Sequence, residues 1–123
     1  MKILFADDQQ ALIEPLQDLL TKRGHSVDLA FDGLKALELI DQNNYEIVFL
    51  DFSLPEVTGL EIVEHIQKTK PAIKTVMMTG YPLMKDFLVN SIGADEYLSK
   101  PFSFEEVVAL LKKNPPRNVD PRS

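Results

Sequence analysis

The chain has 123 residues and a net charge of −6, and its 45% hydrophobic and 26% charged residues are typical of one soluble globular domain. Its basic residues are scattered rather than clustered, which argues against direct nucleic-acid binding. The absence of cysteine excludes disulfides, zinc–thiolate sites and thiol catalysis.

Hydrophobic patterning predicts five β-strands. They are, in chain order, residues 2–6, 26–30, 46–51, 74–79 and 96–99. The first, third and fourth are apolar at consecutive positions, which is typical of parallel strands covered by helices on both faces. The first apolar run, from Ile3 to Ala6, is too short for a signal peptide or a membrane span, so we expect a cytoplasmic protein without a membrane partner.

Segments of helical period alternate with these strands. They are predicted at residues 10–23, 33–42, 58–69, 83–91 and 103–114. One apolar face of the first helix contains Leu12, Leu16, Leu19 and Leu20, and one face of the third contains Leu60, Ile62, Val63 and Ile66. Gly24 and Gly93 are suited to end helices, whereas Ser103 is suited to begin one, as is Pro82. Pro15 should remove a backbone hydrogen bond and bend the first helix unless that helix begins late.

Five consecutive βα units predict an α/β domain with an open, doubly wound parallel sheet, because crossover connections are right-handed and short. The domain is expected to cover residues 1–114. Residues 115–123 are proline-rich and have no periodicity, so they are predicted to be a tail or the stub of a linker.

Polar and charged residues follow the strands at one end. Asp7 and Asp8 follow the first strand, Asp51 ends the third, Thr79 ends the fourth and Lys100 follows the fifth. Because the carboxyl ends of parallel strands lie on the same edge of a sheet, we expect these side chains to converge there.

The chemistry of this set points to a metal and a phosphoryl group. Three carboxylates close together repel one another, and a hard divalent cation with open coordination positions would hold Asp7, Asp8 and Asp51, which favours Mg²⁺. The Thr79 hydroxyl and the Lys100 ammonium suit a phosphoryl group. Together these groups would stabilise phosphoryl transfer to Asp51, whose carboxylate would be the nucleophile.

Four separated motifs also resemble the receiver domain of two-component response regulators, such as the chemotaxis receiver. They are "ADD" at 6–8, "LDFSLPEVTG" at 50–59, "MTG" at 78–80 and "GADEYLSKPF" at 93–102. The resemblance covers residues 2 to about 114. It implies a flavodoxin-like (βα)5 fold with strand order 2-1-3-4-5.

The resemblance also implies roles for single residues. Asp51 corresponds to the phosphoacceptor, which takes a phosphoryl group from a phosphohistidine of a sensor histidine kinase or phosphotransfer protein. Asp8 corresponds to the direct Mg²⁺ ligand and Asp7 to the acidic residue that acts through water. Ser53 would contribute its backbone carbonyl to the metal.

Four more residues match the part of the family that changes shape. Thr79 corresponds to the switch hydroxyl and Lys100 to the lysine that pairs with the phosphoryl group. The Lys100–Pro101 bond matches a cis peptide bond of the family. Tyr97 stands where the switch aromatic rotates inward, which would reshape the surface formed by segments 83–91, 96–99 and 103–114. The effector is unknown, either a separate protein or a covalently linked output domain, and a phosphorylation-dependent dimer is left open.

Two variable positions border the expected site. Ser53 and Tyr81 lie two residues beyond Asp51 and Thr79, where side chains of the family face the attacking water. Because Tyr81 is large enough to shield an acyl phosphate, we hypothesise slow self-hydrolysis.

Each of these residues also has an ordinary structural explanation. An aspartate at a strand end often forms a turn or caps a helix. Taken singly, Thr79 fits a strand-to-loop transition, Lys100 a solvated charge and Tyr97 a half-buried core aromatic. His25 and His65 lack the spacing of metal ligands and are given no role. Only the complete set indicates a function.

Two other functions compete with the switch. A Mg²⁺-dependent phosphohydrolase of the haloacid dehalogenase type also uses a strand-end aspartate, but it needs a second aspartate where this chain has Ser53. A receiver-like interaction module would bind partners without phosphate, which the intact acidic residues speak against. As a switch, the domain would catalyse only its own phosphorylation and dephosphorylation, so it is not predicted to be an enzyme.

Overall fold

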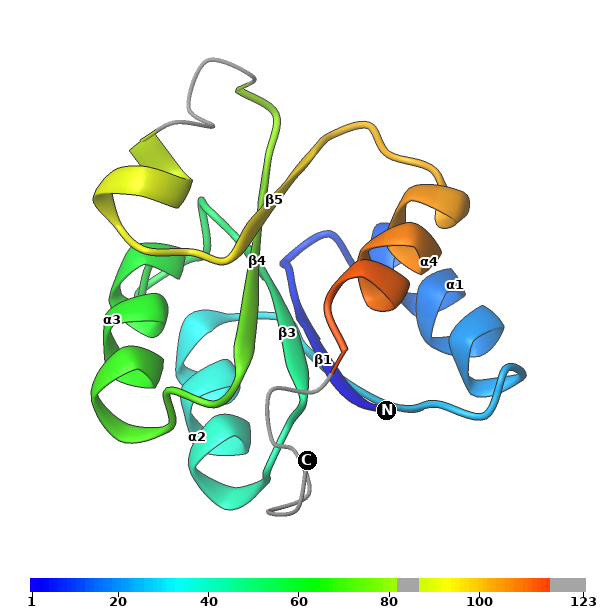
Figure 1. Cartoon of the computed structure of the whole chain (residues 1–123), viewed down its shortest axis with the longest axis horizontal. Coiled ribbons are helices and arrows are strands. Elements are labelled where there is room, and N and C mark those ends of the chain that lie inside the picture. The colour runs from blue at the N-terminus through cyan, green and yellow to red at the C-terminus, as the bar shows by residue number, and fades with distance from the viewer. Residues whose placement is uncertain (82–86, 116–123) are drawn as a thin grey trace.

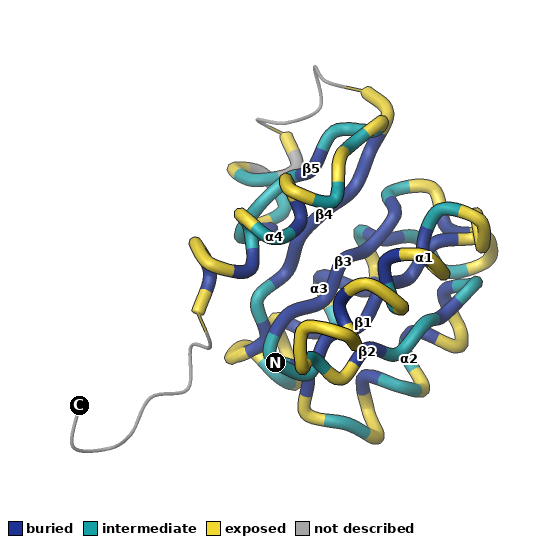
Figure 2. Tube along the Cα trace, turned by 90° about the vertical axis from the view of Figure 1, so that its right-hand side faces the viewer, coloured by how far each residue is buried: buried dark blue, intermediate teal, exposed yellow. Residues whose placement is uncertain are grey.

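The protein is described by a computed structural model over residues 1–81 and 87–115. Five parallel strands form one sheet in the order β2-β1-β3-β4-β5, which confirms the predicted fold. Figure 1 shows helices on both sides of this sheet, and the strand labels of Figure 2 follow the same order. The strands are β1 (Lys2–Ala6), β2 (Ser26–Ala30), β3 (Ile47–Asp51), β4 (Lys74–Thr79) and β5 (Glu96–Ser99). The predicted bounds are confirmed except in β3, which begins at Ile47 rather than at residue 46.

The register of the sheet brings the carboxyl ends of three strands side by side. Ala6, the last residue of β1, pairs with Leu50 of β3, and Asp51 pairs with Met78 of β4. Thr79 follows directly at the end of β4. Residues that follow β1 and residues that end β3 and β4 are therefore neighbours, as expected for parallel strands.

In the described part of the chain, four α-helices and one π-helical turn cover the sheet. They are α1 (Gln10–Thr21), α2 (Gly33–Gln42), α3 (Gly59–Thr69), η2 (Phe87–Ser91) and α4 (Phe104–Lys113). Thr58 and Ser103 begin α3 and α4 with capping boxes, in which a hydroxyl accepts from a backbone N–H and a glutamate accepts in return. The φ angles of Gly24 and Gly93 are 91° and 88°, which suits the helix ends predicted there.

The helix predicted at residues 83–91 is not an α-helix where it is described. Residues 82–86, which include Pro82, lie outside the described residues, and the remaining residues form the π-helical turn η2. Asn90 and Ser91 have low helix propensity and Val89 is β-branched, so the local sequence supports a regular helix weakly.

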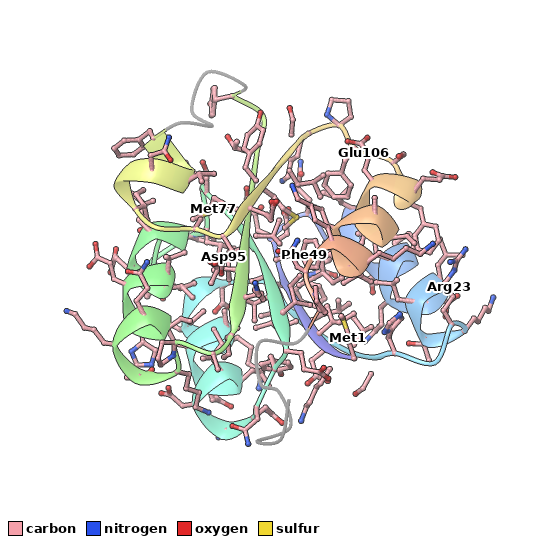
Figure 3. The ribbon with its side chains drawn as sticks, in the orientation of Figure 1. Met1, Arg23, Phe49, Met77, Asp95 and Glu106 are labelled. Atoms are coloured by element: carbon pink, nitrogen blue, oxygen red, sulfur yellow. The ribbon has the colours of Figure 1, made fainter. Side chains whose placement is uncertain are left out.

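The core consists of one apolar cluster on each face of the sheet. Side chains of β1, β3 and β4 that point to one face pack against α2 and α3, and those that point to the other face pack against α1 and α4. Figure 3 labels one residue of each cluster, Met77 toward α3 and Phe49 toward α4. Figure 2 shows the buried strands between helices whose outer sides are exposed. This double cover explains the consecutive apolar residues of the central strands.

The buried face of α1 differs from the prediction. Ile13, Leu16 and Leu20 are buried, whereas Leu19 is 42% exposed and was wrongly placed in the apolar face. A residue one step before Leu20 is rotated about 100° from it, so the true stripe has the spacing 13, 16, 20. Pro15 lies inside α1, which does not begin late, and it faces solvent, where water can take the place of the lost backbone hydrogen bond.

Polar contacts join neighbouring elements at the amino edge of the sheet, opposite the carboxyl ends of the strands. The Asp95 carboxylate accepts from the Thr75 backbone N–H at 2.8 Å, and the Asp95 N–H donates to Thr75 Oγ1 at 3.1 Å. Lys113 at the end of α4 pairs with Glu96 of β5 at 2.8 Å. Between α3 and α2, His65 Nε2 lies 2.7 Å from Asp41 Oδ1, a contact that the sequence did not predict.

No helix within residues 1–81 and 87–115 is both long enough and apolar enough to cross a lipid bilayer.

Candidate functional site

Three carboxylates meet at the carboxyl edge of the sheet. Asp7 and Asp8 follow β1, Asp51 ends β3, and one oxygen from each lies within 4.8 Å of the others. Asp7 is fully buried and Asp51 is only 7% exposed, whereas Asp8 is exposed. The predicted convergence of these residues is therefore present.

Lys100 supplies a compensating positive charge at the same edge of the sheet. It directly follows β5, the edge strand next to β4. Its Nζ donates to Asp7 Oδ2 at 2.6 Å and lies 3.4 Å from Asp51 Oδ1. Its side chain is 18% exposed, so this ammonium is held among the carboxylates rather than in solvent. The Lys100–Pro101 peptide bond that follows is cis.

The electrostatic surroundings disfavour the ionised form of Asp51. Burial raises the pKa of its carboxyl, and the negative charge of Asp7 raises it further. The Lys100 ammonium and a hydrogen bond from the Ser53 backbone lower this pKa without cancelling the increase. An added cation would therefore favour the ionised carboxylate that a nucleophile requires.

Thr79 is buried beside this cluster, at the end of β4. Its Oγ1 accepts a hydrogen bond from the Tyr81 backbone N–H at 3.0 Å. The hydroxyl is thus engaged by the loop that follows its own strand. To bond any group on Asp51, Thr79 would have to exchange this partner or share its oxygen.

An open cleft of 450 Å³ connects these groups to the surface. The residues that line it are Asp8, Gln9, Asp51, Ser53, Thr79, Gly80, Tyr81 and Lys100. Tyr81 is 63% exposed at its rim. Tyr97 does not line this cleft, since it lies half-buried in β5 and packs against the cluster on the α2 and α3 face.

Gln9 is a part of the site that the sequence did not reveal. Its backbone N–H donates to Asp7 Oδ1 at 2.9 Å, and its side-chain carbonyl accepts from Lys100 Nζ at 3.2 Å. The available signal was its position directly after Asp7 and Asp8, at the same strand end.

The donor set fits a hard divalent cation. Asp7, Asp8 and Asp51 offer oxygen ligands alone, and one ammonium cannot neutralise three carboxylates. Magnesium prefers such oxygen ligands and keeps open positions for water or phosphate oxygens. The arrangement can therefore combine a metal, a buried nucleophile and a phosphate-binding cation in one cleft.

Comparison with known proteins agrees with this chemistry. Residues 3–112 match the response regulator receiver domain family. The transcriptional regulatory proteins TctD of Salmonella typhimurium and DltR of Streptococcus agalactiae are 34% identical over 113 residues and 35% identical over 114 residues. Each match covers 91% of this chain and 50% of the relative. The chain spans about half the length of the curated relatives it matches.

Solved structures give the same result. Response regulator TrrA of Thermotoga maritima, in complex with Mg(2+)-BeF, has a TM-score of 0.82 at 34% identity, covering 93% of this chain and 98% of that one. A CheY-like receiver domain of Methanospirillum hungatei has a TM-score of 0.84 at 28% identity, covering 91% and 90%. The chain therefore belongs to the response regulator receiver domain family over residues 3–112, and such a domain is the phosphorylation-dependent signalling switch of two-component systems.

Proposed function

We propose that this receiver domain accepts a phosphoryl group on Asp51 with the help of Mg²⁺, Thr79 and Lys100. The observation that carries the proposal is the meeting of a buried Asp51 with Asp7, Asp8 and the Lys100 ammonium in one cleft. A phosphohydrolase of the haloacid dehalogenase type would also need an aspartate where this chain has Ser53, and a phosphate-independent module would not need the acidic site.

The metal would be held directly by the carboxylates of Asp8 and Asp51, with Asp7 acting through water and the backbone carbonyl of Ser53 as a further ligand. When bound, Mg²⁺ neutralises charge on the carboxylates and on the oxygens of the incoming phosphoryl group. The Lys100 ammonium lies close enough to Asp51 to donate to a phosphoryl oxygen there.

In the transfer, a carboxylate oxygen of Asp51 attacks the phosphorus of a phosphohistidine. The new O–P bond forms as the N–P bond breaks, and the electron pair of that bond leaves with the imidazole of the donor. Lys100 keeps its proton throughout and stabilises the negative charge on the phosphoryl oxygens. The product is an aspartyl phosphate, which water later hydrolyses.

The switch follows from the charge that is added. A phosphoryl group carries about −1.5 to −2 charges at neutral pH, and Thr79, which lines the same cleft as Asp51, would turn toward it. If turning breaks the hydrogen bond from the Tyr81 backbone N–H to the hydroxyl oxygen, that N–H needs another acceptor. Inward rotation of Tyr97 would then reshape the surface of η2, β5 and α4.

The proposed partners are a sensor histidine kinase or phosphotransfer protein and an effector that prefers one form of this surface. That effector is either a separate protein or a covalently linked output domain beyond the proline-rich segment 115–123. A partner shifts the switch only by the difference in its binding free energy between the two forms.

The test is labelling by acetyl phosphate, followed by intact mass. The wild type should gain an alkali-labile phosphoryl mass with Mg²⁺ and lose that ability with EDTA, while Asp51→Asn should gain none. Equal labelling of Asp51→Asn would show that the phosphoacceptor is another residue.

Tyr81→Ala should shorten the life of the phosphoryl group by severalfold. The ring lines the cleft and lies at its rim, where it limits access of water to Asp51. Decay of labelled protein after removal of the donor measures this rate. Tyr81→Phe keeps the ring and should decay like the wild type; if Tyr81→Ala decays no faster than Tyr81→Phe, the ring does not shield the site.

A further inference from the structure

Gln9 occupies the N-cap position of α1 but does not cap the helix. Its side chain makes no hydrogen bond to the first turn of α1. Serine, threonine, aspartate and asparagine are preferred at this position because their short side chains accept from the next free N–H groups. A residue that breaks a local rule in this way is often serving a site instead.

The side chain of Gln9 is directed to Lys100. Its Oε1 accepts from Nζ at 3.2 Å, on the edge of the cleft that contains Asp51. A lysine ammonium has three N–H donors. In this structure Nζ has three acceptors, of which Asp7 and Asp51 are charged and Gln9 is neutral. Every donor of the ammonium therefore has an acceptor in the site.

We propose that Gln9 is the positioning residue of Lys100, because its neutral carbonyl directs the ammonium toward the phosphoryl site without adding a negative charge. The proposal rests on the proposed function of Asp51 and Lys100. The backbone of Gln9 supports the same geometry, since its N–H fixes the other oxygen of Asp7 at 2.9 Å. Asp7 and Gln9 thus both hold the ammonium, which also contacts Asp51.

The neutrality of residue 9 matters because the cleft already contains three carboxylates and one ammonium. A fourth carboxylate at this position would bind the ammonium more strongly than an amide oxygen does. It would also repel an anionic phosphodonor at the mouth of the cleft. An apolar residue would leave one ammonium donor to water and widen the range of positions that Nζ visits.

The test compares rates of labelling by acetyl phosphate at saturating Mg²⁺. Gln9→Met should lower the maximal rate about fivefold, the equivalent of one typical hydrogen bond, with little change in Mg²⁺ affinity. Gln9→Glu should lower the rate about tenfold or more at low salt, and this loss should shrink as ionic strength rises. Gln10→Met and Gln10→Glu are matched controls, since Gln10 does not line the cleft, and they should label like the wild type.

A second measurement separates positioning from a merely structural role. In the Lys100→Ala background, Gln9→Met should change the rate less than about twofold, because its effect passes through the ammonium. If Gln9→Met keeps the wild-type rate, or if its loss persists without Lys100, the positioning proposal is wrong while the proposed function stands. Failure of the wild type to label would instead overturn the proposed function, and with it the role of Gln9.

Discussion

Lys100→Ala is expected to slow labelling of Asp51 by acetyl phosphate about 10²- to 10³-fold, the usual cost of removing one preorganised donor from a transition state. It should also lower the free energy of unfolding of the metal-free protein by roughly 3 kcal/mol. Lys100 pairs with a fully buried Asp7, and removing one partner of a buried pair leaves an uncompensated charge. Chemical denaturation in the presence of EDTA measures the loss of stability.

Magnesium should restore part of the stability that Lys100→Ala loses but little of the labelling rate. The ion can neutralise the carboxylates, but it does not replace the donor beside Asp51. Lys113→Ala is the matched control, because Lys113 is 70% exposed and its pair with Glu96 should contribute less than about 1 kcal/mol. Equal losses of stability in the two variants would mean that the Lys100 pair is no stronger than a surface pair.

Asp51→Asn is expected to stabilise the metal-free protein at neutral pH by an amount on the order of 1 kcal/mol. Burial and the charge of Asp7 raise the pKa of Asp51 in the folded state above its ordinary value of 3.8. The folded protein therefore binds this proton more tightly than the unfolded chain does. Its stability is reduced as pH rises from the unfolded pKa through the folded pKa, and the asparagine avoids this loss.

The gain from Asp51→Asn should therefore depend on both pH and metal. It should vanish below about pH 4, where Asp51 is protonated in both states of the wild type. Saturating Mg²⁺ should stabilise the wild type more than Asp51→Asn. It should therefore narrow or reverse the difference between their free energies of unfolding. Urea denaturation across this pH range gives the comparison. A variant that is less stable than the wild type at pH 7 in EDTA would contradict the raised pKa.

The fold and the central site could be predicted because each strand, and the residue at its end, is recognisable from the local sequence. Consecutive apolar residues in β3 identify a strand covered on both faces, and the carboxyl ends of parallel strands must share an edge. The meeting of Asp7, Asp51 and Lys100 follows from those two facts, although they lie far apart in the sequence.

Other features depend on side-chain geometry that no pattern expresses. Leu19 is a leucine like its buried neighbours Leu16 and Leu20. It is exposed only because of the way α1 is rotated about its axis relative to the sheet. The contact of Gln9 with Lys100 joins residues 91 positions apart and needs a particular rotamer of each. The five described residues of η2 are too few for a sequence pattern to distinguish a π-helical turn from an ordinary helix.

The polar contacts at the amino edge limit where the sheet can deform. Thr75 and Asp95 join the beginnings of β4 and β5, and Glu96 ties the start of β5 to α4. The far end of β5 lies roughly 10 Å from this anchor, given about 3.3 Å per residue, so a tilt of about 10° would displace that end by roughly 2 Å. The displacement caused by a tilt of β5 therefore grows with distance from these amino-edge contacts. It is largest at the carboxyl end of the strand, beside the aspartates.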